Sequence, residues 1–326
     1  MSDVPSNIES FLKNYGTYVI AGHKEPDGDC IGSSLALDSL LRRLGKKTVL
    51  LSAGPFKRPE IKKYEQLFHN SVDPTTLPAD AALVVLDCSN IERIGDAGNG
   101  LESLPIAIID HHATNDTALE HSFVDGKAPS TAFLVQSVVE RLGGSPTKEE
   151  AEYLLFGMCT DTGYFRHLDA TSAQTFAHTS RLVAAGANPK KTFAAMSGGK
   201  SFGSRILISR LLSRMVRYYG GRLVVTYENI EDTQEFGLEG RDSDSLYQLI
   251  QSISGVEAIV VVRQETETDC AVGFRSLDRI DVSLVASSFG GGGHRQASGL
   301  SIKGTINELI PRFVAAFAPQ FEGIAP

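Results

Sequence analysis

The sequence has few cysteines, no long hydrophobic run and no excess of positive charge. Its four cysteines are widely spaced and form no CxxC motif, which argues against a disulfide framework and against a structural zinc site. The longest apolar runs, such as 81–86 and 258–262, are far shorter than a membrane span. The first residues also lack the basic and apolar segments of a signal peptide. We therefore expect a cytoplasmic protein that does not use a membrane as a partner.

Acidic residues outnumber basic residues in this chain. Lysine and arginine total 31 against 39 aspartates and glutamates, so the formal net charge is −8. Such a chain has no general basic surface for long nucleic acid. An anionic substrate must then be attracted by a local site, through bound cations or a few arginines. This favours small substrates over long duplexes.

The length of 326 residues predicts two domains with separate cores. The small-residue stretch 197–203 is the expected linker between a domain at 1–196 and a domain at 204–326. In the first domain, apolar runs indicate buried strands at 17–21, 48–52, 82–86 and 106–109. Amphipathic or capped segments indicate helices at 31–44, 59–68, 131–142, 147–158, 172–185 and 189–196. Strands interleaved with helices predict an α/β domain with a doubly wound parallel sheet.

The second domain shows the same alternation on a smaller scale. Strands are expected at 223–227, 258–263, 270–275 and near 300–302. Helices are expected at 204–219, 243–253, 282–288 and 306–317. These elements predict a smaller α/β domain.

The triplet Asp110-His111-His112 ends the apolar run at 106–109. In an open α/β sheet the carboxyl ends of strands are where ligands bind. Three polar groups at that point are costly to bury unless something satisfies them. Taken alone, the triplet is compatible with a hydrogen-bonded strand end and with a metal site.

A second set of polar groups follows the first expected strand. His23, Asp27 and Asp29 lie on one short loop, with Gly28 allowing a sharp turn. Two carboxylates this close repel each other, and a divalent cation would remove that penalty. A solvated acidic turn that caps the next helix is the alternative.

Two further aspartates complete the pattern. Asp87 ends the strand at 82–86, and Asp161 lies where a helix is expected to end. If these segments meet, they form one crevice that carries four carboxylates and two imidazoles. Such a set suits two divalent ions better than one. The candidate metal ligands are thus His23, Asp27, Asp29, Asp87, His111 and Asp161.

The second domain contains a run of four glycines, Gly290 to Gly293, followed directly by His294. Backbone without side chains lets amide N–H groups approach an anion closely, and the adjacent histidine is able to bind a phosphate oxygen. A plain flexible linker is the alternative. Arg275, in the strand at 270–275, is a second candidate anion contact because of its forked donors.

In order and spacing, these motifs resemble those of the DHH phosphoesterases that carry a DHHA1 domain, and most of all the nano-RNase/pAp phosphatase proteins. The resemblance implies that His23, Asp27 and Asp87 hold one metal ion, and that Asp29, Asp87, His111 and Asp161 hold another. It implies that His112 faces the scissile phosphate while Asp110 orients the histidines, as the catalytic pair. Substrate phosphates would be bound by Arg275, Gly291, Gly292, Gly293 and His294.

The resemblance also implies an activity and its cofactors. We expect hydrolysis of short single-stranded RNA and of 3′-phosphoadenosine 5′-phosphate (pAp), supported by two divalent ions, with Mn²⁺ favoured over Mg²⁺. A phosphodiesterase of cyclic or linear dinucleotides is the main alternative. An inorganic pyrophosphatase and a nonenzymatic nucleotide sensor are weaker ones. Homodimer formation is left open.

Overall fold

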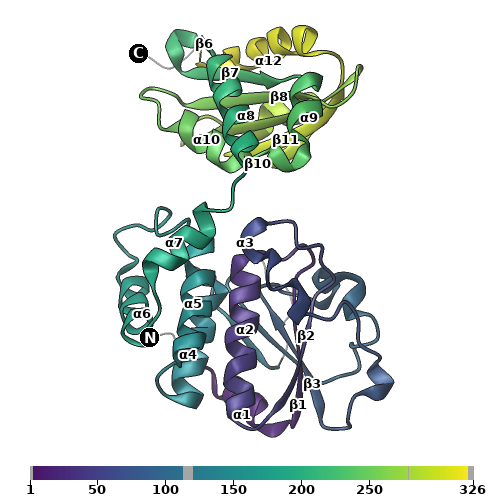
Figure 1. Cartoon of the computed structure of the whole chain (residues 1–326), viewed down its shortest axis with the longest axis vertical. Coiled ribbons are helices and arrows are strands. Elements are labelled where there is room, and N and C mark those ends of the chain that lie inside the picture. Colours follow the sequence, from purple (N-terminus) through teal and green to yellow (C-terminus); the bar gives the residue numbers. More distant parts are fainter. Residues whose placement is uncertain (1–2, 113–119, 278, 322–326) are drawn as a thin grey trace. The chain divides into compact units, whose positions relative to one another are not determined.

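The computed structural model describes residues 3–112, 120–277 and 279–321. The chain divides into two compact units, Met1–Gly199 and Lys200–Pro326. Each unit has its own sheet (Figure 1). Each also has its own hydrophobic core.

The first unit is built on a five-stranded sheet in the order β2-β1-β3-β4-β5. Every neighbouring pair of strands is parallel. The strands are β1 (Thr17–Gly22), β2 (Lys47–Leu51), β3 (Ala81–Leu86), β4 (Ile106–Asp110) and β5 (Ser122–Val124). All residues of β1 and β3 are buried, as is typical of central strands covered on both faces. The parallel α/β sheet predicted from the sequence is therefore confirmed.

Helices and 3-10 turns cover the two faces of this sheet differently. The helices are α1 (Ser6–Asn14), α2 (Gly28–Arg43), α3 (Pro59–Lys62), α4 (Thr131–Gly143), α5 (Lys148–Asp161), α6 (Ala173–Ala184) and α7 (Pro189–Ser197). Helices α2, α4 and α5 pack side by side on one face (Figure 1). The opposite face has a second core that includes the 3-10 segment Ile91–Gly98. Shorter 3-10 turns lie at Glu65–Leu67 and Pro74–Thr76.

The strand order places the start of α2, which follows β1, at the point where the order of the sheet reverses direction. Strand β1 has β2 on one side and β3 on the other. The connections that follow β1 and β3 therefore diverge, which opens a crevice at the carboxyl ends of these strands. The chain segments after β1, β3 and β4 all leave at this edge, because the three strands are parallel.

The second unit has a six-stranded mixed sheet in the order β10-β11-β9-β8-β7-β6. Its strands are β6 (Val216–Tyr218), β7 (Leu223–Glu228), β8 (Ala258–Gln264), β9 (Asp269–Ser276), β10 (Gly292–His294) and β11 (Ala297–Lys303). Strands β7 and β8 are parallel, and the other pairs are antiparallel. The core of one face includes residues of α11 (Val282–Ser288) and α12 (Ile306–Phe321), and that of the other includes residues of α8 (Phe202–Ser213) and α10 (Ser243–Gln251).

The helix predicted at 204–219 ends earlier than expected. Helix α8 stops at Ser213, and the chain then forms β6 and a 3-10 turn at Tyr219–Gly221. Val216, which lies within the predicted range, pairs instead with Val225 of β7. At the point of exit, Arg214 is bonded to Asp232 and to the carbonyl oxygen of Tyr227. Tertiary contacts thus outweigh helical propensity here.

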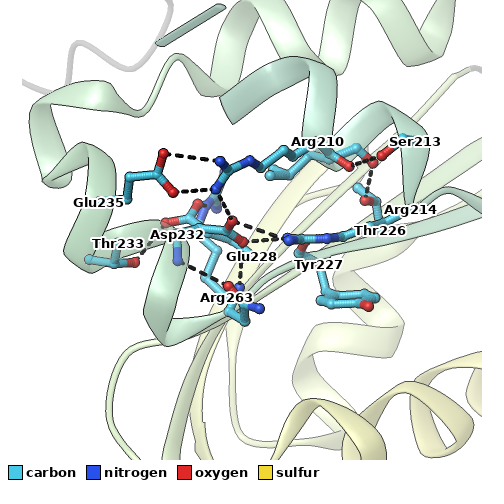
Figure 2. A network of polar contacts seen from close by, with 12 residues as sticks. Arg210, Ser213, Arg214, Thr226, Tyr227, Glu228, Asp232, Thr233, Glu235 and Arg263 are labelled. Atoms are coloured by element: carbon cyan, nitrogen blue, oxygen red, sulfur yellow. Dashed lines mark hydrogen bonds and ion pairs between the residues drawn. The ribbon is translucent and has the colours of Figure 1, made fainter. Parts of the chain in front are cut away.

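A buried ionic network joins α8 and β7 to α9 (Ile230–Phe236) (Figure 2). Asp232 is 1 % exposed and accepts hydrogen bonds from Arg214 and Arg210. Burial raises the pKa of Asp232, but the hydrogen bonds from Arg214, Arg210 and the Asn229 amide, together with the charge of Arg214, outweigh it and the pKa lies below its usual value. Glu228, equally buried, accepts from Thr233 and Arg263. Because every buried carboxylate here has a partner, the network fixes the geometry of this end of the unit.

Candidate active site

Two histidines of the first unit are anchored in the same way. His23 follows β1, and its Nδ1 lies 2.9 Å from the carbonyl oxygen of Lys24. His111 follows β4, and its Nδ1 lies 3.4 Å from the carbonyl oxygen of Ala128. A carbonyl oxygen only accepts, so each Nδ1 carries the proton and each Nε2 is free to donate its lone pair to a cation.

Both Nε2 atoms face carboxylates. His23 Nε2 lies 3.5 Å from Asp87 Oδ2 and 3.9 Å from Asp27 Oδ2. His111 Nε2 lies 3.2 Å from Asp161 Oδ2 and 3.6 Å from Asp87 Oδ1. A neutral imidazole lone pair opposite a carboxylate is repulsive unless a proton or a metal ion lies between them. The donor set therefore fits divalent cations.

Asp87 lies between the two histidines. It directly follows β3, its side chain is 3 % exposed, and its backbone has a positive φ of 60°. Non-glycine residues rarely adopt this conformation, and such strain is often found at functional sites. The hydroxyl of Thr131, at the start of α4, donates to Asp87 Oδ1 at 2.9 Å. Because Oδ2 faces His23 and Oδ1 faces His111, Asp87 is placed to serve both sides of the cluster.

The carboxylates Asp27 and Asp29 also hold the local backbone. Asp27 is the N-cap of α2 and accepts from the amides of Asp29 and Cys30 through Oδ1, which leaves Oδ2 toward His23. Asp29 is fully buried and accepts from the amides of Thr131 and Ala132 at 2.6 and 2.9 Å. These amides belong to the first turn of α4, whose dipole favours a negative charge. This contact joins residues 102 positions apart, so no local sequence pattern predicts it.

Repulsion between the acids is the main electrostatic feature of the cluster. Burial raises the pKa of Asp29 well above its ordinary value, and the neighbouring charges of Asp87 and Asp161 raise it further. The pKa values of Asp87 and Asp161 are also raised, chiefly by burial. Asp161, the last residue of α5, is nevertheless 29 % exposed. Bound cations would reverse these shifts, because their charge favours the ionised acids.

The first unit thus brings the six predicted metal ligands together: a donor atom of each lies within 4.8 Å of a donor atom of another. Donor atoms of Asp29, His111 and Asp161 lie within 4.8 Å of one another, as do those of Asp87, His111 and His112. A third group, which the sequence did not predict, joins the thiol of Cys30 to His23 and Asp87.

His112 differs from the two other histidines because it is held by an acid. Its Nδ1 lies 2.7 Å from Asp110 Oδ1, which also accepts from the His112 amide. Asp110 is fully buried, whereas the His112 side chain is 38 % exposed. The bond to Asp110 raises the pKa of His112 above its ordinary value. His112 is therefore an oriented imidazole that favours its protonated form, with Nε2 left for another partner.

In the second unit, Arg275 and His294 lie in one row across three strands. Ala297 of β11 pairs with His294 of β10 on one side and with Arg275 of β9 on the other. Residues in register across a sheet share a face, so the side chains of Arg275 and His294 leave the same face, roughly 10 Å apart. The next row on that face is Gly292, Gly299 and Gly273. We call the surface formed by Gly292, Ala297 and Gly299 the glycine shelf.

Two neighbouring glycines in this segment differ in whether the fold leaves room for a side chain. A side chain at Gly293 would place its Cβ 2.6 Å from the carbonyl oxygen of Ala297, so the fold itself demands glycine there. A Cβ at Gly292 would meet no atom within 4 Å, and the residue has no positive φ. Since Gly292 lies in β10, the run is not a plain linker.

The chain matches two family descriptions in order along the sequence. Residues 17–158 match the DHH family, N-terminal domain, and residues 220–322 match the DHHA1 domain. A bifunctional oligoribonuclease and PAP phosphatase NrnA of Thermus thermophilus is 33% identical over 289 residues, which cover 89% of this chain and 85% of that protein. The chain belongs to the DHH family with a DHHA1 domain. It is a hydrolase that acts on phosphoester bonds.

Other relatives differ in the activity that their names state. A cyclic-di-AMP phosphodiesterase GdpP of Bacillus subtilis is 26% identical over 97% of this chain, which spans 50% of that protein. Among solved structures, an exopolyphosphatase-related protein from Bacteroides fragilis has a TM-score of 0.82 at 23% identity, covering 97% of this chain and 98% of that one. This likeness concerns the fold. Among the described residues, no helix is long and apolar enough to cross a membrane.

Proposed function

We propose that the protein hydrolyses short oligoribonucleotides to mononucleotides and converts pAp to AMP and phosphate, with two divalent metal ions as cofactors. The observation that carries the proposal is the connected cluster of two histidines and four aspartates in the first unit. The relative of this protein from Thermus thermophilus is named for both activities, and the two chains align over most of their lengths.

The cluster divides into two overlapping sets of ligands. His23, Asp27 and Asp87 would hold one ion, and Asp29, Asp87, His111 and Asp161 would hold the other, with Asp87 shared. Imidazole and carboxylate donors together favour Mn²⁺ over Mg²⁺. When bound, such ions would activate a water and neutralise charge on the phosphoryl group.

The residues around the cluster supply orientation and a proton. The carbonyl oxygens of Lys24 and Ala128 hold His23 and His111 with Nε2 toward the ligand positions. Asp110 holds His112 through Nδ1, so that Nε2 is able to donate a hydrogen bond to a phosphoryl oxygen. His112 is thus the proposed catalytic residue, and Asp110 positions it.

In the second unit, we propose that substrate phosphate is bound on the glycine shelf. Arg275 and His294 flank the shelf, the amides of Gly292 and Gly293 lie in its edge strand β10, and Gly291 directly precedes that strand. Gly292 supports this role. A side chain there would meet no atom of the described residues, so the glycine leaves open space in which a ligand is able to approach the backbone.

A test compares substrates and one matched pair of variants. Full-length protein with Mn²⁺ is assayed on RNAs of two to seven nucleotides, on pAp and on a cyclic dinucleotide. We expect turnover of the short RNAs and of pAp. Asp87→Asn should abolish it, whereas Asp80→Asn, the same change at the exposed opposite end of β3, should not.

Hydrolysis of cyclic di-AMP is the second candidate function. It is favoured by the match to the cyclic-di-AMP phosphodiesterase over 97% of this chain. A clear preference for the cyclic dinucleotide over pAp and short RNA in the same assay would replace the first proposal with this one.

A further inference from the structure

The side chain of Arg275 lies against an aromatic ring that the sequence did not single out. Its guanidinium carbon is 4.5 Å from the ring centroid of Tyr247 in α10. Tyr247 is 4 % exposed and packs in the core beneath α8 and α10. A guanidinium over a tyrosine face at this distance is held by cation–π attraction.

Gly273 makes room for the tyrosine. It lies two residues before Arg275 in β9, on the same face of the sheet. A Cβ built on Gly273 would be 2.2 Å from the Tyr247 hydroxyl oxygen and 3.4 Å from Cζ. The glycine therefore admits the hydroxyl end of the ring, and any larger residue would push the ring away from Arg275.

The other side of Tyr247 is bounded by the ionic network. Arg263 is fixed by Glu228, to which its Nε donates at 3.2 Å, and by Ser243, to which Nη2 donates at 2.9 Å (Figure 2 shows Glu228 and Arg263). A Cβ built on Gly273 would lie 3.9 Å from Arg263 Nη1 and 2.2 Å from the Tyr247 hydroxyl oxygen, so both groups line the same small space. That hydroxyl is buried and has the guanidinium of Arg263 as its neighbour. The ring, rather than its hydroxyl, is thus the part that contributes to binding Arg275.

Arg275 itself retains donors for a ligand. Nη1 donates to the carbonyl oxygen of Phe274 at 2.9 Å. Among residues 3–112, 120–277 and 279–321, no carboxylate forms an ion pair with Arg275. A half-buried arginine in a chain of net charge −8, lacking an acidic partner and lying beside the glycine shelf, is well suited to a phosphate.

We propose that Tyr247 is a positioning residue for substrate binding: its ring holds Arg275 in the orientation in which the free N–H groups receive a substrate phosphate, and Gly273 permits that placement. This inference rests on the proposed function. Without the Tyr247 ring, the long side chain of Arg275 must be ordered when substrate binds. Ordering one such side chain weakens binding by about three- to tenfold.

The test measures KM and kcat for pAp with Mn²⁺ in four variants of the full chain. Tyr247→Phe keeps the ring and should match the wild type. Tyr247→Leu should raise KM about three- to tenfold with little change in kcat, and Arg275→Ala should raise it at least as much. In the Arg275→Ala background, Tyr247→Leu should add nothing, because the ring acts only through the arginine.

Gly273→Ala provides a rescue experiment that separates positioning from loss of folding. The added methyl should displace the hydroxyl and raise KM, and Tyr247→Phe in the same chain should restore it, since the nearest ring atom would then be 3.4 Å away. A variant that merely misfolded would not regain its KM in this way.

Three results would overturn the inference. They are a raised KM in Tyr247→Phe, additive effects of Tyr247→Leu and Arg275→Ala, and an unchanged KM in Arg275→Ala. In each of these the wild type still hydrolyses pAp, and the proposed function stands. A wild type inactive on both pAp and short RNA refutes the proposed function instead, and this inference with it.

Discussion

Divalent cations should stabilise the first unit and reverse the direction in which its free energy of unfolding changes with pH. Without cations, Asp29, Asp87 and Asp161 have raised pKa values in the folded chain. The folded state then binds more protons than the unfolded state between the ordinary aspartate pKa and the raised values. The free energy of unfolding must fall as pH rises through this window.

Mn²⁺ at a hundred times its dissociation constant should raise the free energy of unfolding by about 2.7 kcal/mol. For a unit of this size, that corresponds to an increase in Tm of about 5 to 11 °C. The increase should grow between pH 5 and pH 8, because ionised carboxylates bind the ion and protonated ones do not.

Scanning calorimetry with chelator and with Mn²⁺ at several pH values checks this prediction. Asp161→Asn removes one partly buried charge while the amides of Thr131 and Ala132 keep Asp29 as their acceptor, so it should raise the Tm of the chelated protein at pH 8 and shrink the shift caused by Mn²⁺. Asp80→Asn should change neither. A Tm that rises with pH in chelator, or an undiminished Mn²⁺ shift in Asp87→Asn, would refute the reasoning.

Three further predictions concern catalysis, folding and substrate contact. His112→Gln should lower kcat by about 10²- to 10⁴-fold. In pH–rate profiles of the parent chain, kcat should fall as pH rises through the raised pKa of His112. Asp110→Asn should move this fall in kcat to lower pH, because it removes the bond that raises the pKa. Asp232→Asn should lower the free energy of unfolding by about 1.5 to 3 kcal/mol in urea titrations, because the buried carboxylate loses the charge-assisted hydrogen bonds that it accepts from Arg214. Gly292→Ala should leave Tm unchanged but raise KM, whereas Gly293→Ala should lower Tm.

Much of the fold was predictable because its signals are local. Buried runs such as those of β1 and β3, and the capping box at Thr147 and Glu150 that opens α5, are visible in short windows of sequence. The three-residue strand β5 has one buried residue and gives no such pattern. Helix α8 ended early because its continuation was decided by pairing with β7.

The candidate site was predictable to the extent that the parallel sheet forces its strand ends together. Polar residues directly after β1, β3 and β4 had to meet at one edge once the strands were parallel. Contacts that span the chain were not predictable. The amides of Thr131 and Ala132 on Asp29, and the ring of Tyr247 beneath Arg275, depend on packing between elements far apart in sequence.

The way His23 and His111 are anchored bears on how this site tolerates change. Their Nδ1 atoms contact main-chain oxygens, those of Lys24 and Ala128, rather than side chains. A main-chain oxygen is present whatever residue occupies the position, so the orientation of both imidazoles is insulated from substitution at 24 and 128. His112, held by the side chain of Asp110, has no such protection. Random mutagenesis should therefore recover active variants at Lys24 and Ala128 far more often than at Asp110.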